Sequence, residues 1–131
     1  MDLRKVLVVE DSDLLHQMYE LVLLRYRTRG AVVLHAHNGA EALQRLKSHP
    51  DTDLILLDLY MPVMSGLDFL RFRQEQESLR SIPVLVVTVR GQQDEVAMAL
   101  AAGASGVLTK PLRTDVFHAE VDRLMEARSA L

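Results

Sequence analysis

The sequence predicts a doubly wound α/β domain, in which parallel strands alternate with helices that cover both faces of one sheet. Three short runs, at 6–9, 54–57 and 84–89, are almost wholly apolar and lack the polar alternation of half-exposed strands. Such runs are typical of parallel strands buried on both faces. Weaker strands are predicted at 32–36 and 106–109. Right-handed crossovers between these strands would place the intervening helices on the two faces of the sheet.

Amphipathic patterns between the strands predict five helices. The first has apolar residues at a three-to-four spacing and ends before Gly30; its predicted inward stripe is Leu14, Met18, Leu21, Val22 and Tyr26. Asn38 is the predicted N-cap of a second helix that runs to Leu46, and Ser65 that of a third that runs to about Gln76. The two remaining helices are predicted at 93–102, ended by Gly103, and at 112–127, with Phe117, Val121 and Leu124 inward.

The bulk properties favour one domain over residues 1–131. A chain of 131 residues fits a single core, and no linker, repeat or low-complexity segment divides it. We therefore expect no output domain in this chain. The net charge of −3, with Lys and Arg dispersed, argues against direct nucleic-acid binding, and the first apolar stretch is too short to cross a membrane. The absence of cysteine excludes disulfides and thiolate chemistry and is compatible with the cytoplasm.

Polar residues gather where the predicted strands end. Glu10 and Asp11 follow the first strand, Asp58 follows the third, Thr88 lies at the end of the fourth, and Lys110 follows the fifth. Ligands of doubly wound sheets bind beyond these carboxyl ends. Three crowded carboxylates repel one another unless a hard cation with oxygen ligands holds them ionised. The cluster therefore predicts Mg²⁺.

Asp58 is the predicted nucleophile because it closes the most hydrophobic of the central strands. A carboxylate can form an acyl phosphate, and the protein then contributes mainly positioning and charge stabilisation. The Lys110 ammonium would pair with a phosphoryl group, and the Thr88 hydroxyl would donate a hydrogen bond to it. Taken singly, each residue has a simpler structural explanation: Asp11, Ser12 and Asp13 would cap the first helix. Asp58 would be a turn former at a strand end, Thr88 an ordinary strand residue and Lys110 a solvated lysine. The occurrence of all these residues together, each at the end of its strand, favours a phosphorylation site.

The chain resembles the receiver domain of bacterial response regulators along nearly its whole length. The resemblance rests on Val-Leu-Val-Val-Glu-Asp-Ser at 6–12, Asp-Leu-Tyr-Met-Pro-Val-Met-Ser-Gly at 58–66, Thr88, and Gly-Val-Leu-Thr-Lys-Pro at 106–111. It implies a flavodoxin-like sheet with strand order 2-1-3-4-5, the order also found in chemotaxis receivers. It further implies a phosphoacceptor signalling switch of a two-component system.

The resemblance also assigns roles to individual residues. It implies that a histidine kinase or phosphotransfer protein phosphorylates Asp58, and that Asp11, Asp58 and the Tyr60 carbonyl ligate Mg²⁺, with Glu10 acting through a coordinated water. It implies a cis peptide before Pro111. The switch would catalyse only its own phosphotransfer and slow autodephosphorylation. It would signal to a downstream protein, or to a second copy of itself, through the face of the fourth helix, fifth strand and fifth helix.

Several residues depart from the common receiver pattern. Val107 occupies a position that is usually Tyr or Phe, so an aromatic rotamer change cannot accompany activation here. Val89 replaces a smaller residue after Thr88 and is expected to restrict access to Asp58. Tyr60 and Arg90 occupy positions that tune the lifetime of the phosphoryl group, so we expect an altered lifetime, with no direction assigned.

Three other functions compete with this interpretation. A pseudo-receiver would keep the fold but signal without phosphorylation. A hydrolase of the haloacid dehalogenase type would need an Asp-x-Asp first-strand motif and a cap region, and a flavin carrier would need a phosphate-binding loop rich in Ser and Thr; neither is present. The histidines predict no metal site, because His35 and His37 share one strand face without a third ligand. The complete set is His16, His35, His37, His49 and His118.

Overall fold

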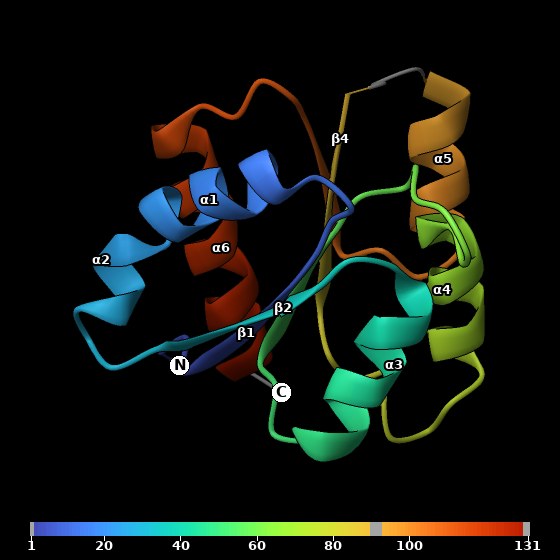
Figure 1. Ribbon diagram of the computed structural model, residues 1–131, viewed down its shortest axis with the longest axis horizontal. Coiled ribbons are helices and arrows are strands. Elements are labelled where there is room, and N and C mark those ends of the chain that lie inside the picture. Colours follow the sequence, from blue (N-terminus) through green and yellow to red (C-terminus); the bar gives the residue numbers. More distant parts are fainter. Residues whose placement is uncertain (1, 90–92, 130–131) are drawn as a thin grey trace.

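The computed structural model describes residues 2–89 and 93–129 and shows one five-stranded parallel sheet (Figure 1). The strand order is β2-β1-β3-β4-β5, which confirms the expected order 2-1-3-4-5. Every predicted strand is present, within one residue at its ends. The strands are β1 (Lys5–Val9), β2 (Val32–Ala36), β3 (Leu54–Leu57), β4 (Val84–Thr88) and β5 (Gly106–Thr109).

Within residues 2–89 and 93–129, six helices connect or follow the strands, where the sequence predicted five. The difference lies in the first helical region, which is broken at Leu23 because this residue serves as the C-cap of one helix and the N-cap of the next. Asn38 and Ser65 cap α3 and α4 through their side chains, as predicted. The helices are α1 (Asp13–Val22), α2 (Leu24–Arg27), α3 (Gly39–Ser48), α4 (Gly66–Gln74), α5 (Gln93–Ala101) and α6 (Thr114–Ser129).

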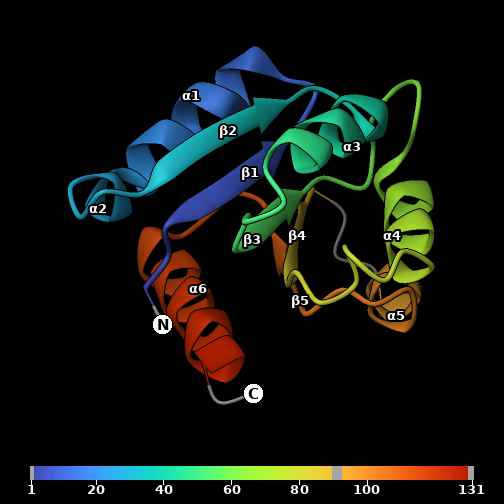
Figure 2. The ribbon, with the colours of Figure 1, turned by 90° about the horizontal axis from the view of Figure 1, so that it is seen from below.

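The helices form a layer on each side of the sheet (Figure 2). Helices α1, α2 and α6 cover one face, where Tyr19, Leu23 and Phe117 pack against alternate strand residues such as Val6 and Val8. Helices α3, α4 and α5 cover the other face, where a second apolar cluster packs against the intervening strand residues. The two clusters account for the apolar strands, because each face of β1, β3 and β4 is buried.

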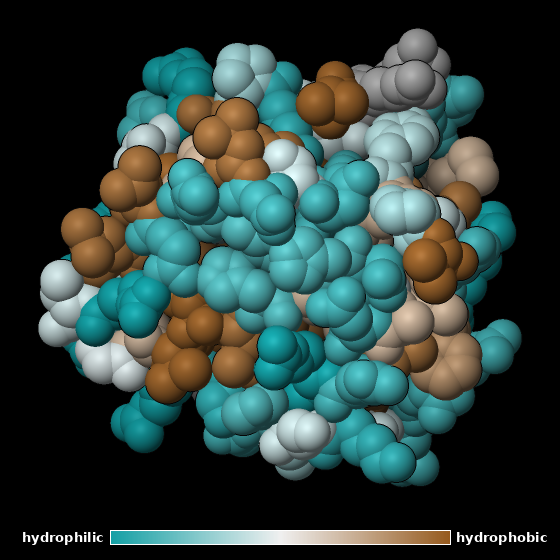
Figure 3. Space-filling model, in the orientation of Figure 1, coloured by the Kyte–Doolittle hydropathy of each residue, from teal (hydrophilic) through white to brown (hydrophobic). Residues whose placement is uncertain are grey.

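The inward face of the first helical region differs from the predicted stripe. Leu14 and Leu21 are 73% and 74% exposed, whereas His16 and Tyr19 are buried. The inward prediction was correct for Tyr26. Exposed apolar side chains consequently gather over α1 and α2 on the face shown in Figure 3. The His16 ring has polar neighbours inside, since its Nε2 lies 2.6 Å from the Glu10 carbonyl oxygen and its Nδ1 lies 2.6 Å from His35 Nδ1.

No helix among the described residues has both the length and the apolar character needed to cross a bilayer.

Candidate functional site

The polar residues at the strand ends are held in place by backbone hydrogen bonds that continue the sheet. The Asp58 N–H donates to the Val9 carbonyl at 3.1 Å, and the Lys110 N–H donates to the Thr88 carbonyl at 2.8 Å. The Glu10 N–H donates to the Ala36 carbonyl at 3.0 Å. Each of these three residues is therefore the first one beyond its strand, and its backbone is as well fixed as the sheet itself.

The structure brings Glu10, Asp11 and Asp58 together at the carboxyl edge of β1 and β3. One carboxylate oxygen of each lies within 4.8 Å of those of the other two, and no other group of three potential metal ligands is this close within residues 2–89 and 93–129. Glu10 and Asp58 are buried, whereas Asp11 is exposed. The cluster that the sequence predicted from strand ends is thus a geometric cluster, open to solvent on the Asp11 side.

Ser12, and not Asp11, caps α1. The Ser12 hydroxyl accepts a hydrogen bond from the Leu15 N–H at 3.3 Å, while the Ser12 N–H donates to Glu10 Oε2 at 3.2 Å. Asp11 is therefore not needed as the helix cap, and the capping explanation for it loses its main support.

Lys110 brings a positive charge to the cluster. Its ammonium donates a hydrogen bond to Glu10 Oε1 at 2.7 Å and lies 3.9 Å from Asp58 Oδ2. Burial raises the pKa of the Asp58 carboxyl, against the opposing charge of Lys110. Burial likewise raises the pKa of the Glu10 carboxyl, although the hydrogen bond from Lys110 acts in the opposite direction. One ammonium does not balance three carboxylates, so the site favours a further cation.

The donor set fits a hard divalent cation such as Mg²⁺. Asp58 Oδ1 is buried and has no hydrogen-bond partner among the described residues. A buried carboxylate oxygen without a partner carries a large desolvation cost, which a bound cation would offset. All donors in the cluster are oxygens, and oxygen is the ligand that Mg²⁺ prefers.

The loop from β3 to α4 packs directly against Asp58 and requires glycine at position 66. A Cβ on Gly66 would lie 2.2 Å from the Asp58 carbonyl oxygen and 2.7 Å from Leu59 Cα. The Gly66 N–H also donates to the Leu59 carbonyl at 3.0 Å. Gly66 therefore sets the path of the loop that carries Tyr60. The sequence shows Gly66 as part of a motif but does not reveal its role, because a close approach of two backbone segments leaves no local pattern in the sequence.

The remaining predicted residues surround this cluster. Thr88 is fully buried at the end of β4, and the peptide bond between Lys110 and Pro111 is cis, as the resemblance implied. Tyr60 and Val89 are 39% and 63% exposed. Val107 is half-buried on β5 opposite Val86. Arg90, expected to influence the phosphoryl lifetime, lies outside the described residues. The metal and phosphoryl roles of Tyr60 and Thr88 stay predictions.

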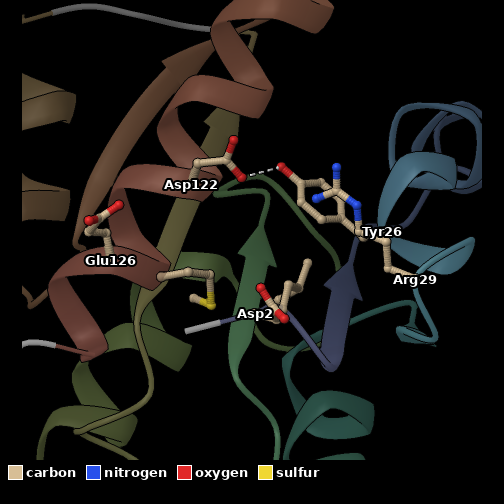
Figure 4. Close-up of a pocket in the computed structure, with 7 residues that line it drawn as sticks. Asp2, Tyr26, Arg29, Asp122 and Glu126 are labelled. Carbon is tan, nitrogen blue, oxygen red and sulfur yellow. Dashed lines mark hydrogen bonds between the residues drawn. The ribbon is translucent and has the colours of Figure 1, made fainter.

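A cavity of about 320 Å³ lies at the opposite edge of the sheet, between α2, α6 and the residues before β1 (Figure 4). It is lined by Asp2, Tyr26, Arg29 and Asp122, among others, and the Tyr26 hydroxyl donates to Asp122 at 2.9 Å. None of the carboxylates of the acidic cluster contributes to it. The two features are therefore separate, and the chemistry of the strand ends does not extend into this cavity.

Comparison with known proteins identifies the family that this arrangement of sheet and acidic cluster belongs to. The family model described as the response regulator receiver domain matches residues 6–122. The chain therefore belongs to the response regulator receiver domain family and is a receiver domain of two-component signalling. Receiver domains are signalling switches and not enzymes in the usual sense.

Individual relatives support the same assignment. The chemotaxis protein CheY1 of Helicobacter pylori is 31% identical over 118 residues, which cover 90% of this chain and 94% of that protein. The two-component response regulator PhoP of Pseudomonas aeruginosa is 36% identical over 126 residues, and the match covers 95% of this chain but only 53% of PhoP. The crystal structure of the signal receiver domain of a histidine kinase from Syntrophus aciditrophicus is 33% identical, with a TM-score of 0.81 over 95% of this chain and 91% of that one.

Proposed function

We propose that the chain accepts a phosphoryl group on Asp58, in a reaction that requires Mg²⁺, from a histidine kinase or a phosphotransfer protein. The observation that carries this proposal is the Asp58 carboxylate itself. It is buried, one of its oxygens has no hydrogen-bond partner among the described residues, and it lies between two further carboxylates and the Lys110 ammonium. Lys110 stabilises negative charge on one side of this nucleophile, and a cation held by the two neighbouring carboxylates would do so on the other.

The protein's own residues would each perform one task in the transfer. An Asp58 oxygen attacks phosphorus, the acyl-phosphate bond forms, and the P–N bond to the donor's histidine breaks. The electron pair of that bond stays with the leaving imidazole, which takes a proton from solvent. Glu10 and Asp11, together with Asp58 and the Tyr60 carbonyl, would hold Mg²⁺, with Glu10 acting through water. When bound, Mg²⁺ neutralises charge on the transferred phosphoryl oxygens.

Lys110 and Thr88 would stabilise the product. The Lys110 ammonium lies 3.9 Å from Asp58 Oδ2, within reach of a phosphoryl oxygen after a small side-chain rotation. Thr88 lies on the neighbouring strand, and its carbonyl holds the backbone of Lys110. A hydroxyl that moves toward the phosphoryl group would therefore pull on the same strand end that carries Lys110. This shared backbone contact couples phosphorylation to β5.

The signal would leave through α5, β5 and α6. This face carries exposed apolar side chains that a partner could bury, among them Leu100 and Val116, which are 48% and 40% exposed. A downstream protein, or a second copy of the chain, would dock here without direct contact to nucleic acid. The place of action would be the cytoplasm. Because Val107 replaces the usual aromatic residue, movement of the Thr88 and Lys110 backbone would have to carry the signal.

The test is the intact mass of the protein after incubation with acetyl phosphate, with and without Mg²⁺. We expect the gain of one phosphoryl mass only when Mg²⁺ is present, and its loss in Asp58→Asn. Asp51→Asn is the matched control, because Asp51 is an exposed carboxylate that forms an ion pair with Lys5 on the opposite edge. Absence of any gain in the wild-type protein would refute the proposal and favour a receiver fold that signals by binding alone.

A further inference from the structure

A polar contact network outside the proposed phosphorylation site joins α1, β2 and α3. His16 on α1 and His35 on β2 face each other with their Nδ1 atoms 2.6 Å apart, and the His37 ring lies 4.7 Å from that of His16. The spacing of the sequence pairs His35 with His37, whereas the fold pairs it with His16.

Hydrogen-bond donors and acceptors fix the state of the two rings. His16 Nε2 lies 2.6 Å from the Glu10 carbonyl, which can only accept, so this nitrogen carries a proton. His35 Nε2 lies 2.6 Å from Glu20 Oε1, and Glu20 also accepts a hydrogen bond from Arg27. Burial raises the pKa of Glu20, but the hydrogen bonds from His35 and Arg27 outweigh it and lower the pKa, so this carboxylate is an acceptor too.

Both remaining nitrogens therefore point at each other. Two neutral rings with protonated Nε2 atoms would present two Nδ1 lone pairs across 2.6 Å, which is repulsive. A cation between them removes this repulsion. Metal-binding histidines characteristically donate their other ring N–H to a carbonyl or a carboxylate, and His16 and His35 show one partner of each kind.

We propose that His16 and His35 form a binding site for a late first-row transition-metal ion such as Zn²⁺ or Ni²⁺, with their Nδ1 atoms as ligands and water in the other positions. Imidazole nitrogen suits these metals, whereas Mg²⁺ prefers oxygen. Metal–nitrogen bonds of about 2.0–2.1 Å in tetrahedral geometry need the two nitrogens roughly 3.3 Å apart, so metal binding requires the two Nδ1 atoms to separate from their 2.6 Å contact. The His35 side chain is 27% exposed, so solvent reaches the pair.

The surrounding charges favour a dication. His37 lies between Asp13 Oδ1 at 3.0 Å and Glu41 Oε1 at 3.4 Å, so both of its nitrogens are occupied and it remains outside the ligand set. With Glu20, three carboxylates surround the histidines. Arg27 pairs with Glu20, and Arg45 donates to the His35 carbonyl at 3.1 Å and not to its ring.

The experiment is calorimetric titration of the untagged chain with either Zn²⁺ or Ni²⁺ as the titrant. The chain carries Asp58→Asn and the buffer contains excess Mg²⁺, so that the acidic cluster does not compete for the added metal. We expect one equivalent to bind, and His35→Gln to weaken binding by at least about tenfold. His49→Gln is the matched control, because it removes a histidine on the loop before β3 whose Nδ1 lies 3.1 Å from Lys5 Nζ, away from His16 and His35. Glu20→Gln should weaken binding by about tenfold or more through loss of the Nε2 acceptor.

Nitrogen-15 spectra of labelled histidine give a second readout. Zn²⁺ should shift the Nδ1 resonances of two rings, and both shifts should be absent in His35→Gln. The proposal is overturned if His35→Gln binds metal as tightly as His49→Gln. It is also overturned if no metal binds to Asp58→Asn with both histidines intact, in which case the spectra should show a proton shared between the two Nδ1 atoms. Because the site lacks Asp58, neither result depends on whether Asp58 is phosphorylated.

Discussion

Val63 offers the most direct test of how the loop beside Asp58 is built. Its φ is +69°, the left-handed region that costs a residue with a Cβ about 1–2 kcal/mol and disfavours β-branched residues most. The Val63 side chain is 85% exposed, so its burial contributes only about 0.3 kcal/mol, a small part of what full burial of a valine would contribute. Replacement by asparagine, which tolerates this conformation, should therefore stabilise the protein by about 1 kcal/mol.

Urea and thermal unfolding of Val63→Asn would measure this gain. We expect a rise in Tm of about 4 °C and an unchanged dependence on urea concentration, since the surface exposed on unfolding stays the same. Val63→Gly should gain less, because glycine also adds about 0.4–1 kcal/mol of conformational freedom to the unfolded chain. Val63→Thr, which stays β-branched, is the control and should gain nothing. Equal stability of wild type and Val63→Asn would refute the assignment of strain to this residue.

Four further predictions concern the site and its support. Because burial raises the pKa of Asp58, stability linked to this carboxyl is present at acid pH and is lost as the pH rises through the folded-state pKa. Asp58→Asn should therefore raise the Tm at pH 8 without Mg²⁺ but not at pH 3, and should abolish stabilisation by Mg²⁺. Gly66→Ala should lower stability by about 1–3 kcal/mol in urea unfolding and slow phosphoryl uptake, because its Cβ meets the Asp58 backbone. Arg73→Met should cost about 1–3 kcal/mol in the same assay, since the buried guanidinium donates to loop carbonyls that would lose their partner. Lys110→Met should strengthen Mg²⁺ binding about tenfold in calorimetry, because a competing cation is removed, whereas the exposed control Lys47→Met should not.

Features encoded locally could be predicted from the sequence. The five strands follow from short apolar runs, because a parallel strand buried on both faces needs apolar residues at consecutive positions. The predicted N-caps Asn38 and Ser65 are confirmed, since a side-chain oxygen at that position accepts a hydrogen bond from a free backbone N–H within the same turn. The cluster of Glu10, Asp11 and Asp58 was also predictable, because parallel strands bring their carboxyl ends to one edge.

Features that depend on distant partners could not be predicted. The predicted inward face of α1 was wrong at Leu14 and Leu21, because the pattern of apolar residues does not reveal that His16 finds polar partners inside. The break at Leu23, which produces a sixth helix, has no proline or glycine to mark it. The close approach of Gly66 to Asp58 likewise depends on a contact between two separate backbone segments.

The position of Lys110 links the charge of the acidic cluster to the proposed signal. Its ammonium is hydrogen-bonded to Glu10 and not to Asp58, at 2.7 Å against 3.9 Å. A phosphoryl group on Asp58 would add negative charge on the Asp58 side of this ammonium and shift the balance of attraction away from Glu10. Because the Lys110 N–H is bonded to the Thr88 carbonyl, such a shift would act on the ends of β4 and β5 together. These two strand ends adjoin the face of α5, β5 and α6, so a change of one ion pair could reach the proposed docking surface without an aromatic switch residue.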